Sequence, residues 1–251
     1  MATSFGALCT DFYVNQKLQV KMDLPSEREA SLHFFERIRQ QLPAMSKFKR
    51  YDGELALESA RKKEDPRYQW LALRRNSIRT GHVNPDTMQE AMDYHKFILQ
   101  QVPYHLSISP LDVDYIELTY GFDLECESNH DEVVYQALFA DTPLGKVMDV
   151  DGGRVLDCQP FVSVNLNDSG TLQAYFEVKT RQKSRRGSAG RYRDEPISIF
   201  LTIRKYGPVD SIDDMQTYLP ELAEHCGQLA IDKLVPDLLN PISQCISSSA
   251  G

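Results

Sequence analysis

The stretch Val113–Glu125, which reads VDYIELTYGFDLE, decides the fold class. Apolar and polar side chains alternate along it, which is typical of a β-strand with one buried face. The apolar side chains that share this face are Ile116, Leu118, Tyr120, Phe122 and Leu124. The other face carries three carboxylates, Glu117, Asp123 and Glu125. They either form an acid/base site or lie on an ordinary solvated sheet face, and we favour the solvated face.

Three further strands are predicted before this stretch. They span Asp11–Met22, Lys49–Glu58 and Tyr68–Ile78, and the charged segment Ala60–Arg67 separates the last two. The strand over Asp11–Met22 is predicted from its alternation of apolar and polar residues, which places Phe12, Val14, Leu18, Val20 and Met22 on one face.

Two helices are predicted between these strands. The first begins at the capping-box pair Ser26 and Glu29 and ends before Pro43. Its expected inner face consists of Leu32, Phe35, Ile38 and Leu42. The second begins at Asn84-Pro85, because Asn suits the N-cap and Pro the first turn, and ends at Pro103. Its expected inner face consists of Met88, Met92, His95, Leu99 and Val102.

The second half of the chain begins with a short helix over Asp131–Phe139 and a loop over Thr142–Gly153. A three-stranded meander follows, with strands over Pro160–Leu166, Thr171–Lys179 and Ile197–Tyr206 and a turn at Asn167–Gly170. A long helix then runs from Asp213 or Pro220 to Leu239. Its expected buried side consists of Met215, Leu219, Leu222, Cys226, Leu229 and Leu238.

The predicted fold class is therefore α+β within a single compact domain, residues 1–251. Residues 1–127 have the order β-α-β-β-α-β of a ferredoxin-like unit. Residues 128–246 hold the antiparallel meander and the long C-terminal helix, and residues 247–251 form a tail.

Composition is that of an ordinary globular protein, with 41% hydrophobic and 25% charged residues. Its apolar runs are too short to span a membrane, and the N-terminus lacks the pattern of a secretory signal. Five cysteines at long, irregular spacings predict reduced thiols without a disulfide framework. These features together predict a cytoplasmic protein.

One basic segment, Lys179–Arg193, stands out on an acidic chain. It holds seven Lys or Arg residues and no acid, in a chain of net charge −8, which leaves −15 for the remainder. Gly187–Gly190 lie inside it, so a loop between two strands is expected. The candidate partner-binding residues are Lys179, Arg181, Lys183, Arg185, Arg186, Arg191, Tyr192 and Arg193. The segment is either a solvated hairpin loop or a docking site for an anion, with Tyr192 able to stack between phosphate contacts.

Several local features resemble the sporadically distributed, uncharacterised prokaryotic family of α+β proteins of similar length. They are the strand with Phe12-Tyr-Val14, the run Trp70-Leu-Ala-Leu73, the helix start at Asn84-Pro85, the strand Asp114–Tyr120, and Glu224-His225 in the last helix. The mid-chain run R-x-G-L-R-Y-x-N of that family is absent here. The resemblance implies a fold and no activity.

Motifs of the common enzyme classes are absent from the sequence. There is no Walker A loop, no Gly-x-Ser-x-Gly elbow and no His-x-x-x-His pair, and Asp149–Gly153 lacks the later ligands of a calcium loop. We therefore expect neither cofactor nor metal. The acidic remainder repels a long polyanion, so a protein partner or self-association is favoured over nucleic acid or a short anionic ligand.

The expected function is that of a non-enzymatic binding or interaction protein, as an oligomer, which docks an acidic partner or anion through the basic segment. The alternative is an enzyme or small-molecule-binding protein whose site lies between the sheet and the helices. A pocket with converging polar groups would favour the alternative.

Overall fold

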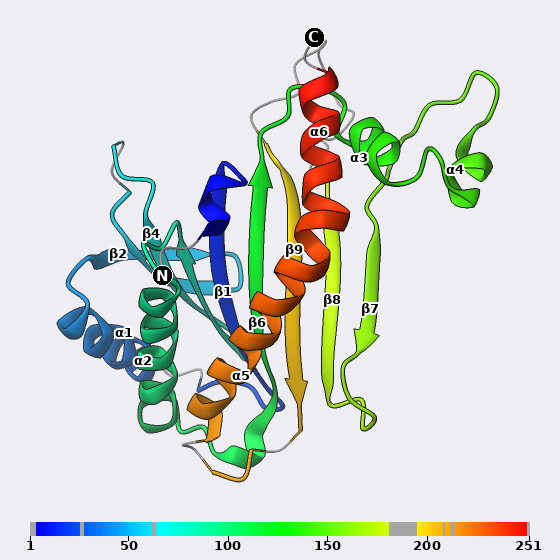
Figure 1. Cartoon of the computed structure of the whole chain (residues 1–251). Coiled ribbons are helices and arrows are strands. Elements are labelled where there is room, and N and C mark those ends of the chain that lie inside the picture. The colour runs from blue at the N-terminus through cyan, green and yellow to red at the C-terminus, as the bar shows by residue number, and fades with distance from the viewer. Residues whose placement is uncertain are drawn as a thin grey trace.

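The computed structural model of the chain describes residues 4–25, 28–61, 64–180, 195–207, 209–211 and 214–249. Helices and strands together form an α+β fold, as the sequence predicts (Figure 1). The strands form one large sheet, and the long helices lie over one of its faces (Figure 1). Within these ranges, none of the helices has the length and apolar character needed to cross a membrane.

Nine antiparallel strands make up the sheet, in the order β2-β3-β4-β5-β1-β6-β9-β8-β7. Their bounds are β1 Asp11–Val20, β2 Met45–Tyr51, β3 Glu54–Ser59, β4 Tyr68–Arg74, β5 Ser77–Val83, β6 Val113–Leu124, β7 Phe161–Asn165, β8 Leu172–Lys179 and β9 Ile197–Tyr206. The predicted meander of the second half is confirmed as β7, β8 and β9.

Strand β6 lies in the interior of the sheet between β1 and β9. The predicted apolar face of this strand is confirmed, because Ile116, Leu118, Tyr120, Phe122 and Leu124 are all buried. Strand β1 alternates in the same way, and Val14 and Leu18 are fully buried on the same face. Helices α2 and α5 pack on this face, where they enclose the main hydrophobic core.

The predicted number of strands before β6 is wrong. The single strands predicted over Lys49–Glu58 and Tyr68–Ile78 are each a hairpin, β2-β3 and β4-β5. Asp52 and Gly53 form the first turn, and Gly53 has a φ of 70°, which glycine adopts without strain. Four strands therefore separate the first two helices, so the order β-α-β-β-α-β and the ferredoxin-like unit predicted for residues 1–127 are not observed.

The α-helices are α1 Arg28–Gln41, α2 Met88–Leu106, α3 His130–Leu138, α4 Pro143–Met148, α5 Asp214–Leu229 and α6 Asn240–Ser249. Three further helical segments are the 3₁₀ turns η1 Ser4–Ala7 and η2 Pro110–Asp112 and the π-helical stretch η3 Ala230–Leu239. Helices α1 and α2 lie over the β1–β5 side of the sheet, and α5 lies over β6 and β9 (Figure 1).

Helix α2 begins and ends later than predicted. Its N-cap is Thr87, whose hydroxyl accepts a hydrogen bond from Glu90 N, and not Asn84. Asn84 instead accepts from Phe12 N and donates to Asp11, which ties the loop to β1. Pro103 lies inside the helix, which continues for three more residues to the buried Leu106.

Two further helix predictions are corrected. In α1, Leu32 is exposed and Phe34 takes the buried position beside Phe35 and Ile38. The predicted cap residue Ser26 lies outside the described residues. The C-terminal helical segment continues through η3 and α6 to Ser249, so the predicted tail begins later than residue 247. Most of its predicted buried side is confirmed, since Met215, Leu219, Leu222 and Cys226 are buried, whereas Leu229 and Leu238 are only partly buried.

Candidate functional site

The face of the sheet turned away from α2 and α5, here called the open face, carries polar and aromatic side chains. Along β1, the residues that point to this face are half-buried, while their neighbours that point to the helices are buried. Strand pairing aligns the open-face residues in rows across the sheet. One row runs through Trp70, Gly81, Asn15 and Thr119 on four successive strands.

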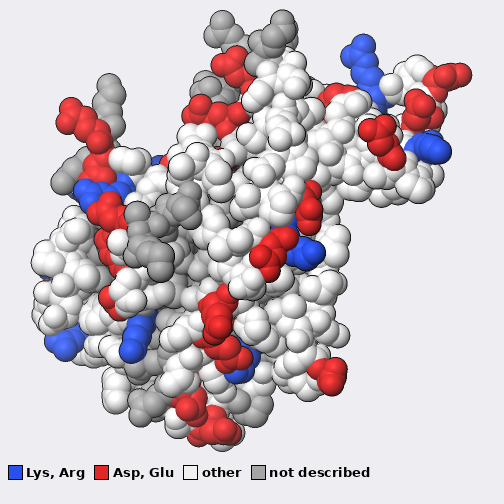
Figure 2. Space-filling model, in the orientation of Figure 1, with Lys and Arg blue, Asp and Glu red and all other residues white. Residues whose placement is uncertain are grey.

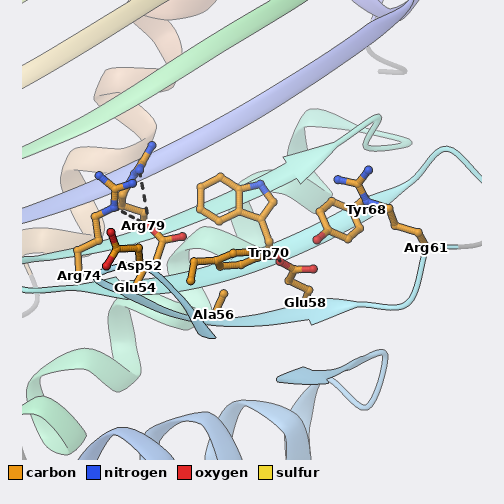
Figure 3. A pocket seen from close by; sticks show the side chains of 10 residues that line it. Asp52, Glu54, Ala56, Glu58, Arg61, Tyr68, Trp70, Arg74 and Arg79 are labelled. Atoms are coloured by element: carbon orange, nitrogen blue, oxygen red, sulfur yellow. Dashed lines mark hydrogen bonds and ion pairs between the residues drawn. The ribbon is translucent and has the colours of Figure 1, made fainter. Parts of the chain in front are cut away.

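A hollow of about 420 Å³ lies on the open face over β2, β3, β4 and β5. It is lined by Tyr51, Asp52, Glu54, Ala56, Glu58, Arg61, Tyr68, Trp70, Arg74 and Arg79. Figure 3 shows Trp70 in the middle of the hollow, between a group with Glu54, Arg74 and Arg79 and a group with Glu58, Tyr68 and Arg61.

Arginines dominate one end of the hollow. Arg74 Nε donates to Glu54 Oε2 at 2.5 Å, and Arg79 Nη1 lies 4.0 Å from the same carboxylate oxygen (Figure 3). The Arg79 guanidinium also lies 5.8 Å from the centre of the Trp70 ring. Within the described part of the chain, the Arg79 guanidinium makes this ion pair with Glu54 and no side-chain hydrogen bond, so most of its N–H donors are available to a ligand.

The acid at the other end, Glu58, is fully engaged. Its carboxylate accepts from the Tyr51 hydroxyl at 2.7 Å and pairs with Lys49 Nζ at 2.5 Å, and the residue is 6% exposed. Burial tends to raise the pKa of Glu58, but the hydrogen bonds from Lys49, Tyr68 and Tyr51 outweigh it and lower the pKa. A carboxylate held ionised in this way supports the walls of the hollow and is poorly suited to act as a general base near neutral pH.

Trp70 can lie over β5 only because its neighbour there is a glycine. A Cβ on Gly81 would fall 2.1 Å from Trp70 Nε1 and 2.5 Å from Asn15 Oδ1, far inside contact distance. The same arrangement occurs between β1 and β6, where a Cβ on Gly121 would fall 2.1 Å from the Tyr13 ring. Large rings therefore lie flat over two glycines of the open face.

A second cluster on the open face is built around Arg204 on β9. Its guanidinium lies 4.2 Å from the Tyr115 ring and 4.7 Å from the Tyr175 ring. Two of its nitrogens contact Glu117 Oε2 at 2.6 and 2.8 Å, and a third donates to Tyr206 at 2.8 Å. The N–H groups of the guanidinium are therefore engaged by Glu117 and Tyr206, and its faces by the Tyr115 and Tyr175 rings. The cluster links β6, β8 and β9 and leaves few donors for a ligand.

The three carboxylates predicted on one strand face do not form one site, and Glu125 lies just beyond the end of β6. Glu117 is paired with Arg204, while Asp123 accepts from the hydroxyls of Ser198 at 2.7 Å and Tyr13 at 3.1 Å. The predicted partner-binding residues are placed only at their first member, Lys179, which pairs with Glu177 at 3.2 Å. Arg181, Lys183, Arg185, Arg186, Arg191, Tyr192 and Arg193 lie outside the described residues.

Between the sheet and the helices lies a buried polar cluster around His95. Its Nδ1 is 2.7 Å from Thr80 Oγ1, its Nε2 is 3.2 Å from the Val14 carbonyl oxygen, and Thr80 also contacts Gln16. Burial, with a smaller effect of nearby His82, lowers the pKa of His95 to about 3. All three side chains are at most 1% exposed, so a substrate has no access to this cluster.

The His, Cys, Asp and Glu residues of the described ranges form no group of three or more that could hold a metal ion. All five cysteines are free thiols, as predicted. Burial is the largest effect on Cys158 and raises the pKa of this thiol to about 11, which disfavours the reactive thiolate.

The residues of the hollow were missed because the two hairpins were missed. Tyr68 and Trp70 are two residues apart in YQWLALR, so they lie on the same side of β4. They lie close to Gly81, Glu58 and Arg79 because the chain turns between β2 and β3 and between β4 and β5, where single continuous strands were predicted.

Neither the models of known protein families nor the curated proteins contain a match to this chain. The resemblance to the sporadically distributed prokaryotic family stays a prediction.

Proposed function

We propose that the chain is a non-enzymatic binding protein and that it takes an anionic ligand, a carboxylate or a phosphate carrying a ring, in the hollow on the open face. The observation that carries the proposal is Arg79, a 36% exposed arginine side chain beside an indole ring. A guanidinium forms its strongest hydrogen bonds with carboxylate or phosphate oxygens, and the neighbouring indole can stack on a planar group.

The charges of the hollow favour an anion. Glu58 is neutralised by Lys49, and Glu54 by Arg74. Arg79 and Arg61 are then the remaining cations, against one carboxylate, Asp52, in the exposed turn between β2 and β3. Arg61 lies 4.2 Å from the Tyr68 ring, which holds this second cation at the other end of the hollow.

The alternative of an enzyme with a site between the sheet and the helices has little support. The polar cluster there, around His95, is sealed from solvent, and the hollow lies on the opposite face of the sheet. The acid at the end of the hollow away from Arg79, Glu58, already accepts a hydrogen bond from Tyr51 and pairs with Lys49.

Docking of an acidic protein or nucleic acid by the basic segment is a separate proposal. It rests on the sequence alone, on the contrast between seven positive charges and an acidic remainder. The side of the molecule in Figure 2 agrees with that contrast, because Asp and Glu outnumber Lys and Arg on it.

Calorimetric titration with phenyl phosphate and with inorganic phosphate tests the binding proposal. We expect saturable binding of phenyl phosphate, and a loss of affinity on the order of 10- to 100-fold in Arg79→Gln, since a charge-assisted hydrogen bond contributes about 1.5–3 kcal/mol. The matched control is Arg75→Gln, an arginine 84% exposed beyond the hollow, which should bind as the wild type does. Equal affinities in the wild type and Arg79→Gln would refute the proposal.

A further inference from the structure

The two edges of the sheet differ sharply in chemistry. Edge strand β2 carries Lys47, Lys49 and Arg50, and charges of this kind protect an edge from pairing with another chain. The opposite edge strand, β7, reads FVSVN and carries no charge, although all five of its residues are exposed. The margin of the molecule along β7 is correspondingly free of coloured charged atoms (Figure 2).

The outer rim of β7 presents unpaired backbone groups. Pro160 O accepts from Val178 N, and Leu166 N donates to Leu172 O, so the even-numbered residues of this strand are turned toward β8. Alternation then turns the backbone N–H and C=O groups of Phe161, Ser163 and Asn165 outward. Among the described residues, β8 is the one strand that pairs with β7.

Apolar side chains cluster around this rim. Phe161 and Val162 are 58% and 56% exposed, on opposite faces of the strand. Residues 139–160, here called the arm, hold α4 and project outward beyond β7 (Figure 1). The exposed apolar side chains of the arm are Leu144, Val147, Val150 and Leu156. Exposed apolar surface of this extent is typical of a protein interface.

We propose that β7 pairs with β7 of a second copy of this chain, antiparallel, around a two-fold axis at Ser163. The central three residues of the strand, Val162, Ser163 and Val164, read the same in both directions about this residue. In that register Val162 faces Val164 of the second copy, Phe161 faces Asn165, and each Ser163 faces the other, so the two valines of one copy meet the two valines of the other next to the axis. A foreign partner would have no need of this symmetry.

The arrangement joins two nine-stranded sheets into one continuous sheet. Because the axis is perpendicular to the strands and to the sheet, both open faces lie on the same side, with their hollows at the far ends. Each arm extends past the β7 edge and meets the other copy, which covers its exposed apolar residues. This inference does not depend on the proposed ligand of the hollow.

Cross-linking across the axis tests the register. Paired residues that exchange backbone hydrogen bonds have Cα atoms about 5.5 Å apart, within disulfide range. Ser163→Cys should therefore form a disulfide-linked dimer rapidly on mild oxidation. In Asn165→Cys, a matched control on the same strand, the two thiols are roughly 14 Å apart along the strands, and cross-linking should be slow. Equal rates for the two variants would contradict the register.

Light scattering during gel filtration tests the dimer itself. Wild-type protein should elute at twice the mass of the chain, and Ser163→Pro should elute as a folded monomer, since proline removes an outward N–H and leaves the bonds to β8 intact. Leu111→Lys, which places a lysine at an exposed apolar residue elsewhere, should stay dimeric. A wild-type monomer over the whole concentration series, a dimer unaffected by Ser163→Pro, or a monomer that gains a strand from an added extended peptide would overturn the proposal.

Discussion

Trp70 lies over Gly81 so closely that a Cβ on the glycine would fall 2.1 Å from the indole nitrogen. The two residues are paired on β4 and β5, and the hollow is formed around the ring that this glycine accommodates. The shape of the candidate site therefore depends on one missing side chain.

Gly81→Ala should displace the indole and deform the hollow. We expect a loss of stability of about 1–3 kcal/mol, as for other overpacked sites, together with weaker binding of phenyl phosphate. Denaturant unfolding and calorimetry measure the two effects. Gly227→Ala is the control, because a Cβ there meets nothing within 4 Å and alanine suits helix α5 better than glycine. If Gly81→Ala is as stable as the wild type and binds as well, the ring is not constrained as described.

Leu118→Ala should destabilise the protein by about 2–5 kcal/mol, because Leu118 is fully buried in the interior strand β6. Leu111→Ala, at a 77% exposed leucine, should change stability by less than about 0.5 kcal/mol. Chemical denaturation compares the midpoints. A midpoint for Leu118→Ala equal to that of the wild type would place this side chain outside the core.

The buried His95 should make stability depend on pH. Its pKa is lowered from an ordinary value of 6.5 to about 3, so below pH 6.5 the unfolded chain binds a proton that the folded chain does not. Stability is therefore complete above this pH and falls as the pH drops, by about 1.4 kcal/mol per pH unit. The partly exposed His105 and the buried His82, whose pKa values are also lowered by burial first, add to the slope in the same direction.

His95→Gln should reduce this slope, and denaturant unfolding at a series of pH values from 7 to 5 measures it. The control is His225→Gln in helix α5, which should keep the wild-type slope. An unchanged slope in His95→Gln would show that the imidazole is not the source of the acid sensitivity.

The basic segment should bind acidic chains in a salt-sensitive way. Replacing Arg185 and Arg186 with serine should weaken binding of a short poly-glutamate peptide at low salt and leave the thermal midpoint nearly unchanged. Replacing Lys47 and Arg50, two exposed cations of β2, removes the same charge elsewhere and should have a smaller effect. Loss of thermal stability without any loss of binding would make the segment an internal electrostatic contact.

The elements with clear periodicity could be predicted from the sequence alone. The alternation around Leu118 predicted β6, and the meander β7-β8-β9 followed from the turn at Asn167–Gly170. The hairpins β2-β3 and β4-β5 were missed because two-residue turns interrupt an alternating pattern very little. Asp52-Gly53 was nevertheless a recognisable hairpin signal.

Tertiary packing overrode the local rules at the end of α2. Pro103 lacks the N–H that the helix would use there, yet the helix continues because Leu106 is buried in the core. The hollow could not be predicted from the sequence for a related reason. Trp70 and Arg79 become neighbours only through the pairing of β4 with β5. An alternating pattern shows which residues of a strand lie outside the core. It does not show which of these residues contact one another across neighbouring strands.

The fluorescence of Trp70 tests the central claim most directly, because it is the only tryptophan of the chain and lies inside the hollow. Titration with phenyl phosphate should change its emission saturably, with the affinity found by calorimetry, and Arg79→Gln should need a higher concentration for the same change. An emission spectrum that stays constant while calorimetry shows saturation would place the ligand elsewhere and contradict the account.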